Sequence, residues 1–175
     1  VGERVASPMT LLAEYVASLR RLLGGERVSV DGRYVRLDGV ELDWPPTAPV
    51  PVLLGAIGPR TMHLAGELGD GVVLTGGTAP DQVSDAVGRV EAGRAAASRT
   101  DPAEIVVYLP AATAIGADPG EDLGVVGDAS VVAEAVRRLA DAGAGTVVLI
   151  PTADEPEAFI RFVAEEVRPM VDRAT

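Results

Sequence analysis

The segment P-V-L-L-G-A-I-G-P-R-T, at residues 51–61, has the residue types and the spacing to bind an anion. It reads as a short apolar strand, a glycine-rich turn and the start of a helix. Pro59 suits the first helical position, because its missing N–H removes no hydrogen bond there. The N–H groups of Arg60 and Thr61 would then be unpaired donors of the first turn. Such a helix start favours a negatively charged ligand, especially a phosphate.

A second glycine-rich turn, T-G-G-T at residues 75–78, follows the next apolar strand. Glycine in both turns lets the backbone approach a ligand closely, and both turns are expected at one rim of a parallel sheet. A simpler interpretation stays open, in which both are βα turns that need glycine only in order to bend. The pattern is not a Rossmann fingerprint, because G-A-I-G-P lacks the third glycine and no ribose-binding acidic residue follows at the required distance.

Few other side chains suggest chemistry. His63 is the only histidine, which excludes a metal site with several histidine ligands, and a structural or exposed role is expected for it. Asp70 precedes a strand at the opposite rim, where a stabilising role is expected. Trp44 could stack on a ligand, but its proline neighbours favour a packing role. The other charged side chains considered are expected on solvated helix faces: Arg89, Arg94, Arg99, Glu165 and Glu166.

Composition and charge exclude several classes of partner. Of the 175 residues, 47% are hydrophobic, which is enough for a substantial core in a single domain spanning residues 1–175. The formal net charge of −11 argues against binding to nucleic acid or to an anionic membrane surface. The chain has no cysteine, and therefore no disulfide and no thiol nucleophile. Without a signal peptide or a long apolar run, the expected location is cytoplasmic.

Hydrophobic periodicity predicts a helix from Ser7-Pro8, a small β excursion over 28–37, and then alternating strands and helices. Pro110 is expected to bend a strand or to break its pairing. Asp128 is expected to cap a helix, and Asp154 to begin a capping box for the last one. The strands are expected at 52–54, 72–74, 104–115 and 146–150, and the last helix is expected to bury Phe159, Val163, Val167 and Met170.

This alternation implies an α/β fold with parallel strands and right-handed crossovers. Four strands are half of an eight-stranded TIM (β/α)8 barrel, which typically needs about 250 residues. Half a barrel has exposed strand edges and an uncovered apolar inner face. We therefore expect either a homo-oligomer or pairing with a missing N-terminal half. The start at Val1, without an initiator Met, reads as the interior of a longer chain.

Four segments, in order along the chain, resemble one family. The motif G-A-x-G-P-R-x-x-x-L-A-G-E-x-x-D-G-V-V-L, from Gly55, is similar to the second-half signature of the bacterial luciferase-like monooxygenases. Among these it is most similar to the branch that uses coenzyme F420, a 5-deazaflavin. The other segments are S-P-M-T-L-L-A-E-Y-V-A-S-L-R-R-L-L-G-G-E, V-S-V-D-G-R-Y-V-R-L and G-V-V-G-D-A-S-V-V-A-E-A-V-R-R-L-A-D-A-G-A-G-T-V-V-L. The resemblance covers nearly the whole chain and implies the C-terminal half of a TIM barrel.

The resemblance implies where a cofactor would bind. In the family, F420 or FMN lies at the carboxyl-terminal mouth of the barrel, and the protein binds and orients it. The turn at 55–58 would run beside the cofactor, the following helix start would hold its phosphate-bearing tail, and the second strand end would contact tail or substrate. The residues implied are Gly55, Ala56, Ile57, Gly58, Arg60, Thr61, Leu74, Thr75 and Gly76. The family's acid–base residues lie on earlier strands, so no catalytic residue and no metal ligand is predicted here.

The expected function is that of an oxidoreductase of this family, using F420, or alternatively FMN, for hydride transfer or monooxygenation of a small-molecule substrate. Thr78 stands where related sugar-phosphate dehydrogenases have a basic residue, which argues against a phosphorylated substrate. Two alternatives stay open. One is a non-catalytic ligand-binding or assembly module derived from the family, and the other is a different TIM-barrel enzyme that binds a substrate phosphate at the glycine-rich turns.

Overall fold

The computed structural model describes residues 5–113, 124–152 and 156–172. The chain begins with helix α1 (Pro8–Leu23) and a two-stranded antiparallel hairpin, β1 (Val28–Asp31) and β2 (Arg36–Val40). Strands and helices then alternate, as the sequence predicts. They are β3 (Leu53–Gly55), α2 (Pro59–Leu68), β4 (Gly71–Leu74), α3 (Pro80–Ala96), β5 (Glu104–Ala112), β6 (Val125–Val126), α4 (Ala129–Asp141), β7 (Thr146–Pro151), α5 (Pro156–Phe162), the π-helix η1 (Val163–Val167) and α6 (Arg168–Asp172).

Strands β3, β4, β5 and β7 form one parallel sheet in that spatial order, which confirms the predicted half of a barrel. The short strand β6 was not predicted. It pairs with Ala111 and Ala112 of β5. At Ala111, β7 occupies one side of β5. β6 therefore lies on the opposite side, the side of β4, and continues the sheet there beyond the end of β4.

Pro110 does not end the central strand, and the break in pairing predicted there lies on one side of β5 only. β5 continues to Ala112, and Pro110 stands opposite Ile150 of β7. On its other side, pairing with β4 ends at Val107, so the missing N–H of Pro110 removes no bond to that strand. The proline ring instead lies close to Gly76, where an added Cβ would be 2.9 Å from the Cγ of Pro110.

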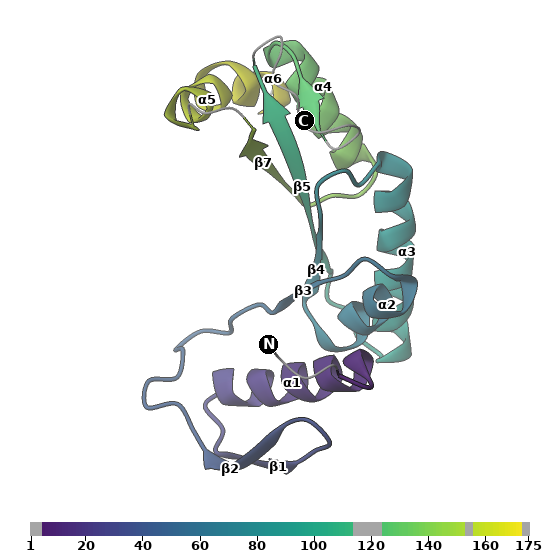
Figure 1. Ribbon diagram of the computed structural model, residues 1–175, viewed down its shortest axis with the longest axis vertical. Coiled ribbons are helices and arrows are strands. Elements are labelled where there is room, and N and C mark those ends of the chain that lie inside the picture. The colour runs from purple at the N-terminus through teal and green to yellow at the C-terminus, as the bar shows by residue number, and fades with distance from the viewer. Residues whose placement is uncertain (1–4, 114–123, 153–155, 173–175) are drawn as a thin grey trace.

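One face of the sheet is covered by helices and the other is open (Figure 1). Helices α2, α3 and α4 pack on the covered face, whose core includes Leu54, Val72, Leu74, Ile105 and Val107. On β7, exposed and half-buried residues alternate along the whole strand. The most exposed large side chains of β5 and β7 are Tyr108 at 39%, Val148 at 36% and Ile150 at 37%.

Two glycines allow α2 and α3 to approach closely. A Cβ added to Gly66 would lie 2.0 Å from the carbonyl oxygen of Val90, and one added to Gly93 would lie 2.0 Å from that of His63. No side chain larger than hydrogen fits at either position unless the backbones move apart. This contact holds α2, and with it the turn that precedes it, in place against the sheet.

The hairpin is joined to α1 by Glu14. Its carboxylate accepts hydrogen bonds from the N–H groups of Arg33, Tyr34 and Val35, at 2.8–3.0 Å. These bonds, the one from Tyr34 contributing most, lower the pKa of Glu14. At the far end of the chain, Arg168 N–H donates to Val163 O in the wide turn of η1, directly before Pro169, which has no N–H to donate.

The prediction for Asp128 is confirmed, because its Oδ1 accepts from the N–H groups of Ser130 and Val131. The packing role predicted for Trp44 is wrong, since the side chain is 89% exposed. In the last helical segment Phe159 and Val167 are buried, but Met170 is 41% exposed. The capping box predicted at Asp154 lies outside the described residues, as does the predicted strand end beyond residue 113. No helix within the described ranges is long and apolar enough to cross a bilayer.

Candidate functional site

The turn after β3 and the turn after β4 lie side by side at the carboxyl ends of their strands. Gly55 pairs with Val73, and Ala56 N–H donates to Val73 O at 3.4 Å. Between the two turns is a cavity of about 320 Å³, here called the loop cavity. It is lined by Ala56, Ile57, Met62, Leu74, Thr75, Gly76, Gly77, Thr78, Gln82 and Asp85. The predicted meeting of the two glycine-rich turns at one rim is therefore confirmed.

Five of the nine residues singled out in the sequence line the loop cavity: Ala56, Ile57, Leu74, Thr75 and Gly76. The other four, Gly55, Gly58, Arg60 and Thr61, form the adjoining turn and the first turn of α2. Ala56 and Leu74 are buried and form the floor, whereas Ile57 is 81% exposed at the rim. The nine residues thus form one continuous surface, of which only a part is enclosed.

The first turn of α2 has free backbone donors. Thr61 Oγ1 donates to Gly58 O at 2.8 Å and accepts from Gly58 N–H at 3.2 Å, so the threonine hydroxyl is used within the turn. Met62 N–H donates to Gly58 O at 3.0 Å. The N–H groups of Arg60 and Thr61 donate to no acceptor in the described part of the chain. Together with the exposed Arg60 side chain, they give this turn the positive potential of a helix N-terminus.

The second turn is held by its own hydrogen bonds. Thr78 Oγ1 donates to Thr75 O at 2.7 Å, and Gly77 has a φ of +83°, a conformation that favours glycine. At the start of α3, Gln82 Oε1 accepts from Ala79 N–H at 2.9 Å. The turn is thus fixed without a ligand, which leaves the Gln82 amide N–H groups and the Thr75 hydroxyl as polar groups near the cavity.

Sequence reasoning missed three residues of the cavity, Met62, Gln82 and Asp85. All three come from helices, one turn or more beyond the glycine-rich segments. Gln82 and Asp85 are three residues apart, and this spacing places two side chains on the same face of a helix. Had the first turns of α3 been considered together with the strand end before it, this spacing would have identified both.

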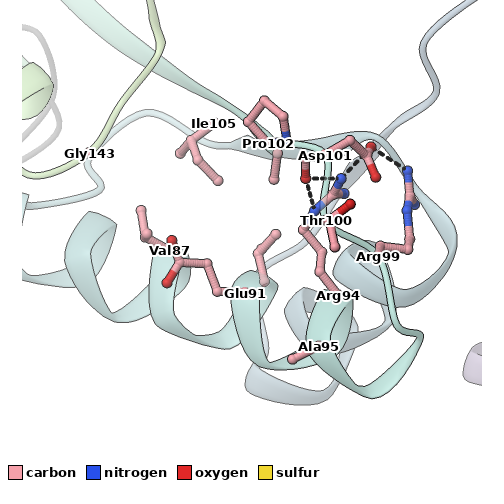
Figure 2. Close-up of a pocket in the computed structure, with 12 residues that line it drawn as sticks. Val87, Glu91, Arg94, Ala95, Arg99, Thr100, Asp101, Pro102, Ile105 and Gly143 are labelled. Carbon is pink, nitrogen blue, oxygen red and sulfur yellow. Dashed lines mark hydrogen bonds and ion pairs between the residues drawn. The ribbon is translucent and has the colours of Figure 1, made fainter.

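A larger cavity, of about 520 Å³, lies at the opposite end of the sheet, beside the start of β5 (Figure 2). Its two arginines are held by the protein itself. Arg94, only 4% exposed, donates to the carbonyl oxygen of Asp101, and Arg99 donates to the carbonyl oxygen of Gly69 and, at 2.8 Å, to Asp70. The prediction that Arg94 and Arg99 lie on a solvated face is therefore wrong. They join the loop before β5 to the α2–β4 turn.

Asp70 has the stabilising role that the sequence predicts. It accepts from Arg20 at 2.5 Å, from Val52 N–H at 2.8 Å and from Arg99 at 2.8 Å. Burial by itself would raise the pKa of Asp70, but these hydrogen bonds outweigh it and lower the pKa to about 2. The carboxylate thereby connects α1, the entry to β3 and the loop before β5.

His63 lies in α2 as predicted, with Nδ1 3.4 Å from Glu67 Oε1 one turn later. Its side chain is 42% exposed and does not line the loop cavity. Glu165 and Glu166 are exposed, also as predicted.

A family model described as luciferase-like monooxygenase matches residues 1–122. The chain belongs to the luciferase-like monooxygenase family. The matched range includes both glycine-rich turns and every residue of the loop cavity.

Curated relatives of this luciferase-like protein include enzymes of several named activities. It is 35% identical over 111 residues to the 5,10-methylenetetrahydromethanopterin reductase of Methanolobus tindarius, a match covering 63% of this chain and 33% of that protein. It is 40% identical over 74 residues to the F420-dependent glucose-6-phosphate dehydrogenase of Nakamurella multipartita, a match covering 42% of this chain and 22% of that protein. The matched segments thus span a third or less of these relatives.

A solved structure confirms the fold over almost the whole chain. An F420-dependent secondary alcohol dehydrogenase in complex with an F420-acetone adduct superposes with a TM-score of 0.85 at 20% identity, covering 98% of this chain and 64% of that one. The coenzyme F420 dependent tetrahydromethanopterin reductase from Methanopyrus kandleri superposes with a TM-score of 0.79 at 21% identity, covering 96% and 65%. The luciferase-like protein therefore has the fold of part of these TIM-barrel enzymes.

Proposed function

We propose that this protein acts as an F420-dependent oxidoreductase, and that the turn after β3 with the start of α2 binds the phosphate-bearing tail of the cofactor. The observation that carries the proposal is the geometry of this turn. Two free N–H groups and Arg60 lie beside the loop cavity, at the carboxyl ends of two parallel strands. The names of the relatives supply the cofactor, since both the alcohol dehydrogenase and the glucose-6-phosphate dehydrogenase are F420-dependent.

The glycines of the turn fit this role, because protein packing does not require them. A Cβ added to Gly55 would meet no atom within 4 Å, and one added to Gly58 would only touch Thr61 Oγ1 at 3.7 Å. Neither glycine is among those with positive φ. Alanine would therefore be accepted by the protein at both positions, whereas a ligand lying against the backbone would exclude it.

When bound, F420 accepts or donates the hydride. The residues of this chain would hold it: the N–H groups of Arg60 and Thr61 and the Arg60 guanidinium would bind the anionic tail, and Ala56 and Ile57 would pack against the cofactor. Leu74, Thr75 and Gly76 would form the neighbouring wall, at tail or substrate. Among the described residues of the loop cavity, Asp85 is the ionisable one, and its carboxylate pairs with Arg89 at 2.7 Å. We therefore assign no proton-transfer residue within this chain.

The open face of the sheet supports a second part of the proposal, that further parallel strands cover it in the working enzyme. Helices flank both edges of the sheet, because α1 packs beside α2 and the α5–α6 segment packs beside α4 and β7. If a second copy completed an eight-stranded barrel, its α5–α6 segment would occupy the position that α1 of the first copy already holds. A body with four strands and no additional flanking helices would fit without this conflict, which favours a missing N-terminal half over a homo-oligomer.

The function is tested by measuring F420 affinity for the protein made from its whole gene, by the change in F420 fluorescence. Gly55→Ala is expected to leave the unfolding midpoint unchanged and to weaken F420 binding at least tenfold. Gly88→Ala is the matched control, because a Cβ there also meets no atom within 4 Å, but on the outer helix α3. If Gly55→Ala bound F420 as tightly as Gly88→Ala, the turn would not be the cofactor site.

A charge variant tests the tail separately. Arg60→Gln removes a charge-assisted contact worth about 1.5–3 kcal/mol, which corresponds to a loss of affinity of about 10-fold to 150-fold. Arg36→Gln, on the exposed hairpin, removes the same charge far from the turn and should change the affinity little. FMN, titrated in parallel, shows whether the protein binds F420 or FMN more tightly. Failure of both cofactors to bind would favour a non-catalytic module.

A further inference from the structure

Trp44 is the most exposed large apolar side chain among the described residues, and the proposed cofactor site does not use it. Its side chain is 89% exposed, and every residue from 41 to 50 is exposed as well. Val40, Leu42 and Val50 add exposed apolar surface to the same stretch. Burying an indole removes a large apolar area from water, so a cluster of this kind indicates an interaction surface.

The exposed stretch lies at the end of the sheet opposite to the loop cavity. It leads from the hairpin into the amino end of β3, on the side of the sheet away from α2 and α3 (Figure 1). Prolines at 45, 46 and 49 fix the backbone angle φ, and a proline after Trp44 confines that residue to extended angles. A Cβ added to Gly25, at the end of α1, would lie 3.5 Å from Pro45 Cβ. The indole is therefore presented on a preorganised backbone.

A hollow of about 310 Å³, here called the base hollow, begins two residues after Trp44. Trp44 itself is not among the residues that line it. These come from the exposed stretch and from the end of α1: Arg20, Leu23, Gly24, Pro46, Thr47, Ala48, Pro49 and Val50. The backbone carbonyl groups of residues 46–50 accept no hydrogen bond from the described residues.

The base hollow offers the groups that an indole ring needs. Its proline rings and Leu23 are apolar, and its carbonyl groups can accept from the indole N–H, which only donates. The Arg20 guanidinium, in a side chain that is 39% exposed, can stack on the ring while it keeps its ion pair with Asp70. Two carboxylates are shared by three arginines in this cluster, which leaves a positive charge opposite in sign to Asp43, the neighbour of Trp44.

We infer that two copies of this protein associate through this surface, each placing its Trp44 in the base hollow of the other. A second copy supplies both the indole and the hollow on one short stretch, and a two-fold axis brings the two contacts together. Tryptophan and arginine at the centre of an interface commonly carry most of its binding energy. The surface is separate from the open face of the sheet, so this pairing differs from the completion of a barrel by a second copy. It does not depend on the proposed function.

The test measures the mass of the protein made from its whole gene by sedimentation equilibrium over a range of concentrations. Trp44→Ala should raise the dissociation constant of the assembly at least about thirtyfold, the effect of losing one interface hot spot. Ile160→Ala is the matched control, because Ile160 is also an exposed apolar side chain, 64% exposed, but lies on α5. It should leave the dissociation constant unchanged.

A mixing experiment tests the reciprocal contact. Ala48→Glu places a long charged side chain in the base hollow and leaves Trp44 intact. Neither Trp44→Ala nor Ala48→Glu should associate with itself through this surface. A mixture of the two should form mixed pairs, because one variant keeps its hollow and the other keeps its indole.

Three results would overturn the inference. The first is equal dissociation constants for Trp44→Ala and Ile160→Ala, and the second is a mixture that forms no mixed pairs. The third is a fluorotryptophan signal of Trp44, assigned with Trp44→Phe, that stays shielded from solvent at every dilution, because another part of the same protein would then cover the indole. None of these results bears on the proposed function, since F420 affinity is measured separately and should be unchanged in Trp44→Ala.

Discussion

Replacing Asp70 by asparagine should destabilise the protein in a way that depends on pH. The carboxylate accepts hydrogen bonds from Arg20, Val52 N–H and Arg99, and its pKa falls from 3.8 to about 2 in the folded protein. At 1.36 kcal/mol for each pH unit, this lowering corresponds to about 2 kcal/mol of stability at pH 7. The side chain is 22% exposed, so solvent screens this contribution only in part.

The sign of the pH dependence follows from the lowered pKa. The contribution of Asp70 is fully present above the unfolded-state value of 3.8 and is lost as the pH falls toward 2. At pH 3 about half of it should remain. The free energy of unfolding of Asp70→Asn should thus lie about 2 kcal/mol below that of the unmodified protein at pH 7, and the gap should narrow below pH 4.

Urea unfolding followed by circular dichroism at several pH values between 3 and 7 measures this gap. Asp31→Asn is the matched control, because the Asp31 side chain is 91% exposed in its pair with Arg36. Asp31→Asn should lower the free energy of unfolding by less than about 1 kcal/mol at every pH tested. The reasoning would be refuted if the two variants lost equal stability at pH 7, or if the Asp70→Asn gap stayed constant down to pH 3.

Two further substitutions test the contacts that position the site. Gly93→Ala should lower the free energy of unfolding by about 2–3 kcal/mol, because its Cβ would lie 2.0 Å from His63 O. Gly88→Ala in the same helix should leave the free energy of unfolding unchanged or raise it by up to about 1 kcal/mol. Thermal unfolding measures both, and equal midpoints would contradict the close helix contact. Asp128→Ala removes the acceptor for two N–H groups of α4 and should cost about 1 kcal/mol by urea unfolding, with no change in F420 affinity.

The architecture was predictable because its signals are local. Apolar runs, glycine turns and proline positions indicate where strands and helices begin, and their alternation implies a parallel sheet. The same reasoning placed the two glycine-rich turns at one rim, since the carboxyl ends of parallel strands share an edge. β6 escaped prediction because two valines carry no periodicity.

The errors concern side chains whose surroundings come from distant parts of the chain. Arg94 follows Val90 by four residues, so helical spacing alone places it on the buried side, but its partners Asp101 and Gly69 appear only in the fold. Trp44 was expected to pack beside its neighbouring prolines, but its side chain is 89% exposed. At Pro110 the predicted break in pairing is limited to one side of β5, because β4 ends before reaching it while β7 continues past it.

The most direct test of the central claim is to locate F420 on the protein made from its whole gene, by amide chemical shifts or by a crystal structure of the complex. The account predicts contacts along Gly55–Thr61 and at Leu74–Gly76, with the anionic tail on the N–H groups of Arg60 and Thr61. Binding confined to the cavity beside Arg94 and Arg99, at the other end of the sheet, would contradict it.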